Sequence, residues 1–214
     1  MNYLAHLYLA EPSDDGLLGS LLGDFVKGRP DTRLRAGVRR GILLHRAIDS
    51  YTDAHPLHRA SRNRISPLRR RYAGIIVDVC YDHFLCRRWE RYSNERLERF
   101  SARVYDLLAR HHDVLPPRLA RLAPRMIAHD WLGSYAELDN VGRALDGISR
   151  RLSRENPLAG ALIEVEDNYA ELERDFRRFF PELARAAIGL CADLRAREPP
   201  DDASGALVGA RRLG

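Results

Sequence analysis

Residues 73–92 read AGIIVDVCYDHFLCRRWERY, and this is the most apolar stretch of the chain. Apolar side chains fill nearly every position of its first turns, which is typical of a helix buried on all sides. Its polar exceptions are Asp78, Asp82 and His83. A buried charge is costly unless it is paired or coordinates a metal. The stretch therefore predicts a central helix that carries either buried ion pairs or part of a metal site.

Proline and glycine divide the rest of the chain into further helical segments. No alternating β-branched run bounded by turn residues predicts a strand. The pattern favours an all-α fold with one domain of about eight to ten helices over residues 1–198. Residues 199–214 are rich in Pro, Asp, Gly and Ala and predict a flexible tail. The other expected helices are 1–10, 16–27, 33–54, one restarting at Pro56, 94–111, 117–131, 138–151 and a long region of 157–180 and 181–197 bent at Pro181.

The composition is that of a globular protein with a strongly basic balance. The chain has 214 residues, of which 45% are hydrophobic and 30% charged, and Lys27 is the single lysine among 35 basic residues. No apolar run approaches the roughly 20 residues that span a bilayer. The first residues lack a basic start and a small-residue cleavage site, so we expect a cytoplasmic protein with no membrane span.

Two stretches place candidate metal ligands four residues apart. His45, Asp49 and Asp53 have this spacing, and so do Asp78 and Asp82. Residues four apart lie on one helix face. The ordinary alternative for the first pair is an i,i+4 contact worth a few tenths of a kcal/mol. For Asp82 and the adjacent histidine it is a buried ion pair with an arginine.

Two more candidates come from single residues. Asp24 follows an apolar helical run, where the helix dipole disfavours a carboxylate, so it needs a cation such as Lys27, Arg29 or a metal. His6 lies between apolar residues, and by itself it favours a satisfied core histidine over a ligand.

The chain has no nucleophile elbow, phosphate-binding glycine loop or HExxH motif. A mixed carboxylate and imidazole set suits Mg²⁺, Mn²⁺ or iron better than a structural zinc. Such a metal activates water and neutralises charge on a phosphoryl group. The chemistry that follows is hydrolysis of a phosphoester.

Four segments taken in order resemble the acyl carrier protein phosphodiesterase family. They are MNYLAHL at residues 1–7, GDFVKG at 23–28, the run from His45 to Asp53, and DVCYDHFL at 78–85. The resemblance extends to about Leu194 and places the chain in a divergent branch of the HD-domain phosphohydrolases, with their helical fold. It implies hydrolysis of the phosphodiester between 4′-phosphopantetheine and the serine of holo-acyl carrier protein, with Mn²⁺ as preferred metal and Mg²⁺ or Fe²⁺ as alternatives.

On this resemblance we expect a set of metal ligands and a set of catalytic residues. In the wider HD superfamily the histidine precedes the aspartate, whereas here the order is Asp82-His83. Asp53 and Asp78 are expected to accept hydrogen bonds from the metal ligands or to act as bases. His6 is expected to donate a hydrogen bond to the phosphate or to bind the metal, and Arg46 to stabilise phosphoryl charge. The expected metal ligands are Asp24, His45, Asp49, Asp82 and His83.

The expected partner is the acidic carrier protein, attracted by arginine clusters that added salt would screen. The clusters are Arg39-Arg40, Arg69-Arg70-Arg71 and Arg87-Arg88. Two alternatives remain: an HD-type phosphohydrolase acting on a small phosphoester or nucleotide, and a non-catalytic protein that binds an acidic partner. Aromatic residues interleaved with basic ones are sparse, so nucleic acid is not expected as a partner.

Overall fold

The computed structural model describes residues 2–197, and the predicted tail at 199–214 lies outside them. This part of the chain forms eleven α-helices and no strand, which confirms the all-α prediction. Three short 3₁₀ turns, η1 to η3, cover Arg70–Tyr72, Trp89–Arg91 and His112–Val114. The helices are α1 Tyr3–Leu9, α2 Asp14–Leu22, α3 Ala36–Ala54, α4 Pro56–Arg64, α5 Ala73–Arg87, α6 Leu97–Arg110, α7 Pro117–Ala128, α8 Trp131–Ser134, α9 Leu138–Arg151, α10 Leu162–Asp167 and α11 Tyr169–Arg197.

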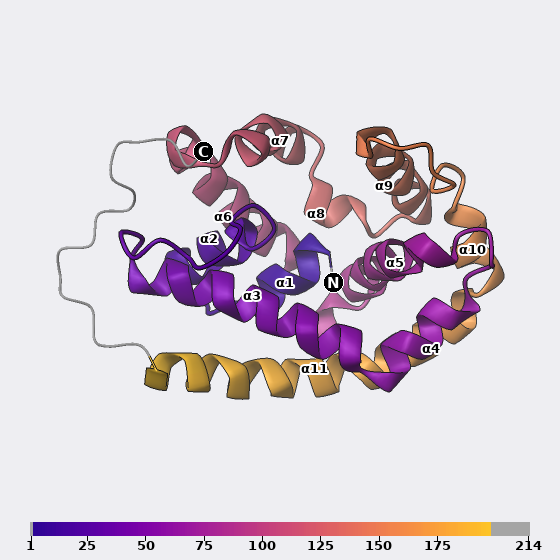
Figure 1. The fold of residues 1–214 in the computed structure, drawn as a ribbon, viewed down its shortest axis with the longest axis horizontal. Coiled ribbons are helices and arrows are strands. Elements are labelled where there is room, and N and C mark those ends of the chain that lie inside the picture. Colours follow the sequence, from indigo (N-terminus) through magenta and orange to yellow (C-terminus); the bar gives the residue numbers. More distant parts are fainter. Residues whose placement is uncertain (1, 198–214) are drawn as a thin grey trace.

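The short helix α1 lies in the middle of the molecule (Figure 1). It packs on α2, α5 and α11, while α3 runs beside α11 along one side. The segments α7, α8 and α9 lie along the opposite side, and α4 and α10 close one end (Figure 1). Because α1 is surrounded by longer helices, its side chains meet groups from distant parts of the sequence.

Helix α5 is the central helix that its sequence predicts. Ile76, Val77 and Leu85 are fully buried along it. The helix ends at Arg87 instead of reaching residue 92, because the chain tightens there into η2, but Trp89 of that turn stays buried. Asp82 and His83 of α5 are therefore held inside the protein, as expected, whereas Asp78 is partly exposed.

Helix boundaries follow local signals in some places and tertiary contacts in others. Pro56 starts α4, and α9 has the predicted bounds. Helix α2 ends at Leu22, five residues earlier than predicted, and the chain then forms a loop up to α3. Pro181 lies inside α11, within the long helical region predicted there, although α11 begins only at Tyr169 and the separate short helix α10 precedes it.

Helices α2 and α3 touch through their backbones at Gly19 and Gly41. A Cβ atom added to Gly19 would lie 2.7 Å from the Cα of Gly41, and one added to Gly41 would lie 2.8 Å from the Cα of Gly19. Only glycine permits this approach. The close packing carries the C-terminal end of α2 to the middle of α3, where His45 lies.

None of the helices within residues 2–197 combines the length and the apolar character needed to cross a membrane.

Candidate metal centre

Two histidines from different helices lie face to face at the centre of the molecule. His6 comes from α1 and His45 from α3, and their ring centroids are 3.7 Å apart with an interplanar angle of 12°. Both side chains are buried. The packing of α1 and α2 against α3 therefore joins two imidazoles that are far apart in the sequence.

Asp49 lies one turn after His45 and reaches both imidazoles. Its Oδ1 is 3.0 Å from Nε2 of His6, and its Oδ2 is 3.3 Å from Nε2 of His45. Asp24, in the loop after α2, approaches from the solvent side, with Oδ1 3.4 Å from Nε2 of His45. Its side chain is 55% exposed, whereas the histidine is buried. Two imidazoles and two carboxylates thus converge, and the carboxylates are the members that solvent reaches.

Several of these donor atoms lack the hydrogen bonds that buried polar atoms normally make. Within the described residues, neither ring nitrogen of His6 has a hydrogen-bond partner, and Nδ1 of His45 has none. Nε2 of His6 is close to Asp49 but is not aligned with it as a hydrogen bond. Of these atoms, Nε2 of His6 is the one that lies beside a carboxylate of the cluster, so it is the one that could bind an ion there. The set of two imidazoles and two carboxylates fits Mn²⁺ or Fe²⁺, which accept mixed nitrogen and oxygen ligands.

The charges of the cluster support the same conclusion. Burial lowers the pKa of His6 to about 4, against the raising effect of Asp49, so this ring is neutral. Burial also acts to lower the pKa of His45, but Asp24 and Asp49 outweigh it and raise that pKa to about 9. The pKa of Asp49 falls well below its usual range, because both histidines outweigh the effect of burial. Protonated His45 therefore supplies the positive charge that a divalent cation would replace.

Gly23 and Arg46 shape the loop that carries Asp24. A Cβ atom added to Gly23 would overlap the imidazole of His45, so the ring rests directly on the backbone. The guanidinium of Arg46 donates to the carbonyl groups of Val26 and Gly28. These hydrogen bonds hold the loop, and the expected role of Arg46 in stabilising phosphoryl charge stays a prediction.

The structure does not bring Asp82 and His83 to this cluster. Asp82 is fully buried and accepts hydrogen bonds from the backbone N–H groups of Leu4 and Ala5 at 2.8 and 3.0 Å. His83 has both ring nitrogens within hydrogen-bonding distance of other groups. Their donors and acceptors are already satisfied, so their placement differs from the expected role as metal ligands.

Asp53 and Asp78 also lie outside the group of four donors. The side chain of Asp53 is 71% exposed, and its Oδ1 is 3.5 Å from Arg62. Asp78 accepts a hydrogen bond from Nε2 of buried His58 at 3.1 Å. The exposure of Asp53 follows from its position near the end of α3, past the segments that cover the middle of that helix.

Comparison with known proteins identifies the class of the chain. Residues 1–183 match the family model described as acyl carrier protein phosphodiesterase. The chain belongs to the acyl carrier protein phosphodiesterase family. Curated relatives with that name include proteins of Serratia proteamaculans, 40% identical over 87% of this chain and 97% of the relative, and of Yersinia pestis, 37% identical over the same shares. A relative from Photorhabdus laumondii is 35% identical over 87% of this chain and 95% of its own. No solved structure matches the chain.

In this family member, the sequence alone did not indicate that Tyr3 borders the site. Burial raises the pKa of Tyr3 to about 12, Asp24 adds to that effect, and Arg118 and Arg151 oppose it. The hydroxyl therefore remains a hydrogen-bond donor at neutral pH, and it responds electrostatically to Asp24 and to the exposed Arg118 and Arg151. No local spacing links these four residues, because they come from four separate segments.

Proposed function

We propose that this protein hydrolyses the phosphodiester that joins 4′-phosphopantetheine to the serine of holo-acyl carrier protein, releasing the apo-carrier protein. The family match over residues 1–183 is the observation that carries the proposal. The cluster of His6, His45, Asp49 and Asp24 supports it, because imidazole and carboxylate donors are suited to a metal-dependent phosphodiesterase.

We further propose that these four residues hold one divalent cation, with Mn²⁺ preferred and Mg²⁺ or Fe²⁺ as alternatives. A bound cation of this kind lowers the pKa of water and neutralises charge on the phosphoryl oxygens. His6, His45 and Asp49 offer ligand atoms within 4.8 Å of one another, from two buried imidazoles and one partly exposed carboxylate. Asp24 supplies the fourth donor from the exposed side, so the substrate enters beside it.

The residues around Asp24 suit an anionic substrate. Tyr3 keeps its proton and can donate a hydrogen bond to a non-bridging oxygen of the phosphodiester. Arg118 and Arg151 are exposed and make no ion pair within residues 2–197. Their positive charges offset that of the carboxylate and favour a phosphate at this entrance.

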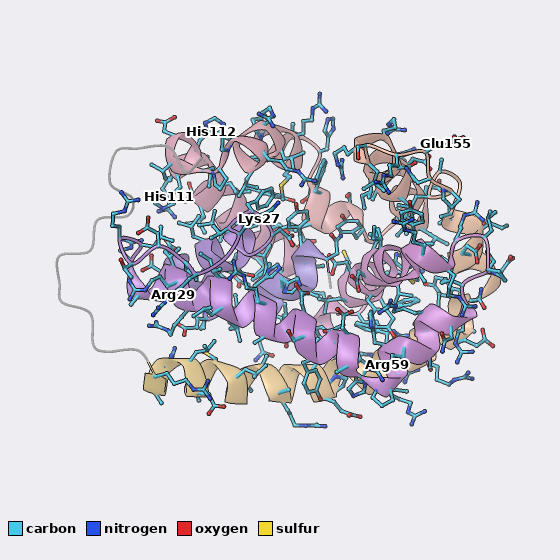
Figure 2. The ribbon with its side chains drawn as sticks, viewed as in Figure 1. Lys27, Arg29, Arg59, His111, His112 and Glu155 are labelled. Carbon is cyan, nitrogen blue, oxygen red and sulfur yellow. The ribbon has the colours of Figure 1, made fainter. Side chains whose placement is uncertain are left out.

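The arginine clusters contribute unequally to a carrier-binding surface. In each expected cluster, at least one member is held by the protein itself: Arg40 pairs with Glu11, Arg69 with Glu164 and Arg88 with Glu173. Figure 2 shows Lys27 and Arg29 on the loop between α2 and α3, and Arg59 on α4, so basic side chains are spread over the surface. An arginine already paired with a carboxylate is a poor choice for binding an acidic partner.

Arg71 and Arg87 remain as the members best placed to meet the carrier protein. Both are exposed and form no ion pair in the described part of the chain. Arg87 also lines a cavity of about 790 Å³ at the C-terminal end of α5. We propose that these two arginines, and not the whole clusters, attract the acidic carrier.

The reaction is tested by incubating the full chain with holo-acyl carrier protein and Mn²⁺ and following the carrier by mass spectrometry. Loss of the 4′-phosphopantetheine mass, dependent on the metal, is the expected result. An unchanged carrier would contradict the proposed substrate. Turnover of a small phosphoester under the same conditions would then favour a small-substrate phosphohydrolase.

Carrier binding is tested with Arg71→Glu and Arg87→Glu. We expect each to raise KM for the carrier several-fold at low salt, with kcat unchanged, and the effect to shrink as salt is added. Arg185→Glu on α11 is the matched control, because Arg185 is exposed and lies outside the three clusters. An equal rise in KM for the control would show that only net charge matters.

A further inference from the structure

The adjacent residues Asp82 and His83 of α5 hold two different segments of the chain. Asp82 accepts hydrogen bonds from the N–H groups of Leu4 and Ala5 through separate carboxyl oxygens. These N–H groups belong to the first turn of α1, where a helix has no internal acceptor for them. The residue before α1, Asn2, provides no side-chain cap. Asp82 therefore caps α1 from another helix.

His83 holds the segment that follows α8. Its Nδ1 donates to the carbonyl of Tyr135 at 2.7 Å, and its Nε2 lies 2.9 Å from the hydroxyl of Tyr169. The carbonyl can only accept, so the ring carries its proton on Nδ1 and accepts at Nε2. The hydroxyl of Tyr135 in turn accepts a hydrogen bond from Asn2 at 2.8 Å. The start of α1 and the segment after α8, which α5 holds separately, are thus also joined to each other by a hydrogen bond.

We propose that Asp82, His83 and Tyr135 form an α1 clamp whose role is to position His6 against His45. His6 follows Ala5 directly, so the carboxyl group that fixes Ala5 also fixes the start of the turn that carries the imidazole. At the other side, the hydroxyl of Ser20 donates to the carbonyl of His6 at 3.0 Å. This inference rests on the proposed metal centre, and it makes the three residues positioning residues instead of ligands.

Helix α1 needs such anchors because it has only seven residues. Helices this short are not stable by themselves, so external contacts determine where α1 lies. The first turn is held by Asp82, the preceding residue by Tyr135 and the middle by Ser20. Removing one anchor would let α1 shift or fray. The imidazole of His6 would then move away from the other three proposed ligands.

The first test measures Mn²⁺ binding to the purified full chain by calorimetry. Asp82→Ala should weaken Mn²⁺ binding about tenfold, as when a residue that orients a ligand is lost, without changing the stoichiometry. Asp82→Asn keeps one acceptor and should weaken binding less. Asp175→Asn is the matched control, because that buried carboxylate accepts from Ser61 and Arg64, away from α1. Complete loss of the bound metal in Asp82→Asn would overturn the proposal in favour of a direct ligand.

The second test reads the clamp without metal or substrate, by amide hydrogen exchange at Leu4 and Ala5. Tyr135→Phe removes only the hydroxyl bonded to Asn2, and we expect faster exchange at both amides together with a few-fold loss of Mn²⁺ affinity. Tyr105→Phe is the control, since its hydroxyl bonds Asp130 and Leu132. Unchanged exchange in both Tyr135→Phe and Asp82→Asn would overturn the clamp.

The two tests separate this inference from the proposed function. Exchange can be measured in metal-free protein, so the clamp can fail while carrier hydrolysis is observed. Conversely, the variants could show the expected changes in amide exchange and Mn²⁺ affinity while the wild-type protein leaves the carrier unchanged. That result would contradict only the proposed substrate.

Discussion

His6 and His45 lie in one buried region, and Asp82 and His83 in another, yet the two regions contain the same residue types in opposite states. The first pair stacks ring on ring, and three of its four ring nitrogens have no hydrogen-bond partner among the described residues. In the second pair, both carboxyl oxygens and both ring nitrogens have partners. This difference is the one expected if the first pair belongs to the proposed metal centre and the second pair positions other segments.

The carboxyl groups of the two regions also differ in the direction in which their pKa values are shifted. Asp49 lies between two imidazoles, which lower its pKa and keep it ionised. Burial raises the pKa of Asp82 to about 7, although the N–H groups of Leu4 and Ala5 oppose the rise. One carboxyl group therefore lies between imidazoles that favour its ionised form, whereas the other is fully buried and is held by two backbone N–H groups.

The largest expected effect comes from removing a donor of the first region. His45→Ala leaves Asp24 and Asp49 without the positive charge between them, and it deletes a central ligand. We expect loss of Mn²⁺ binding and a fall in kcat of about a thousandfold or more. Carrier mass spectrometry and calorimetry measure the two effects.

His83→Gln is the matched histidine variant in the second region. It should lower Mn²⁺ affinity no more than about tenfold. Equal losses in the two histidine variants would remove the distinction between the regions.

The next largest effect is expected for Gly23→Ala. The added methyl group would overlap the ring of His45 and displace it from Asp24 and Asp49. We expect a fall in Mn²⁺ affinity of about a hundredfold, with the helical content unchanged by circular dichroism. Gly189→Ala is the control, because a Cβ atom there meets no atom within 4 Å. Normal metal binding by Gly23→Ala would show that the position of the ring is not restricted by the backbone.

Local pattern was enough to predict the fold class and much of the helix layout. The apolar run of α5, the proline that starts α4 and the bounds of α9 are all properties of neighbouring residues. The loop after α2 was not predicted, because Arg46 of α3 holds it from a distant part of the chain. The long helical region expected across Pro181 is present, but its first part is divided into α10 and the start of α11.

The site was only partly predictable, for the same reason. The four-residue spacing of His45 and Asp49 indicated that they share a helix face, and the structure places them together. The same spacing applied to Asp53, which is exposed, and to Asp82, which caps α1. Periodicity tells which residues share a face, but not which helix that face meets. His6 had no periodic partner, because its partner is on α3.

A smaller effect is expected at the entrance to the first region. Tyr3→Phe removes a hydroxyl that can donate to the phosphodiester but leaves the ring in place. We expect kcat/KM for the carrier to fall about five- to tenfold, with Mn²⁺ affinity unchanged, because one neutral hydrogen bond contributes about 1 kcal/mol. Tyr72→Phe, on a half-buried tyrosine of η1, is the control. A matching loss of Mn²⁺ affinity in Tyr3→Phe would assign the hydroxyl to the metal centre instead.

The smallest effect concerns the pH dependence of folding stability in the second region. The pKa of Asp82 is about 7 in the folded protein and about 3.8 in the unfolded chain, so the folded state binds the proton more tightly. This contribution to stability is complete below pH 3.8 and is lost as pH rises to about 7. The Asp82→Asn variant has no titrating group at this position. Between pH 5 and pH 7, the free energy of unfolding of the wild type should therefore fall by about 1–2 kcal/mol more than that of the variant. Urea unfolding at several pH values measures the free energy of unfolding of both proteins. The contributions of the other titrating groups cancel in the difference between the two. A difference between the two proteins that stays constant over this range would mean that Asp82 is ionised in the folded protein, as Asp49 is, and the two regions would no longer be distinguished by charge.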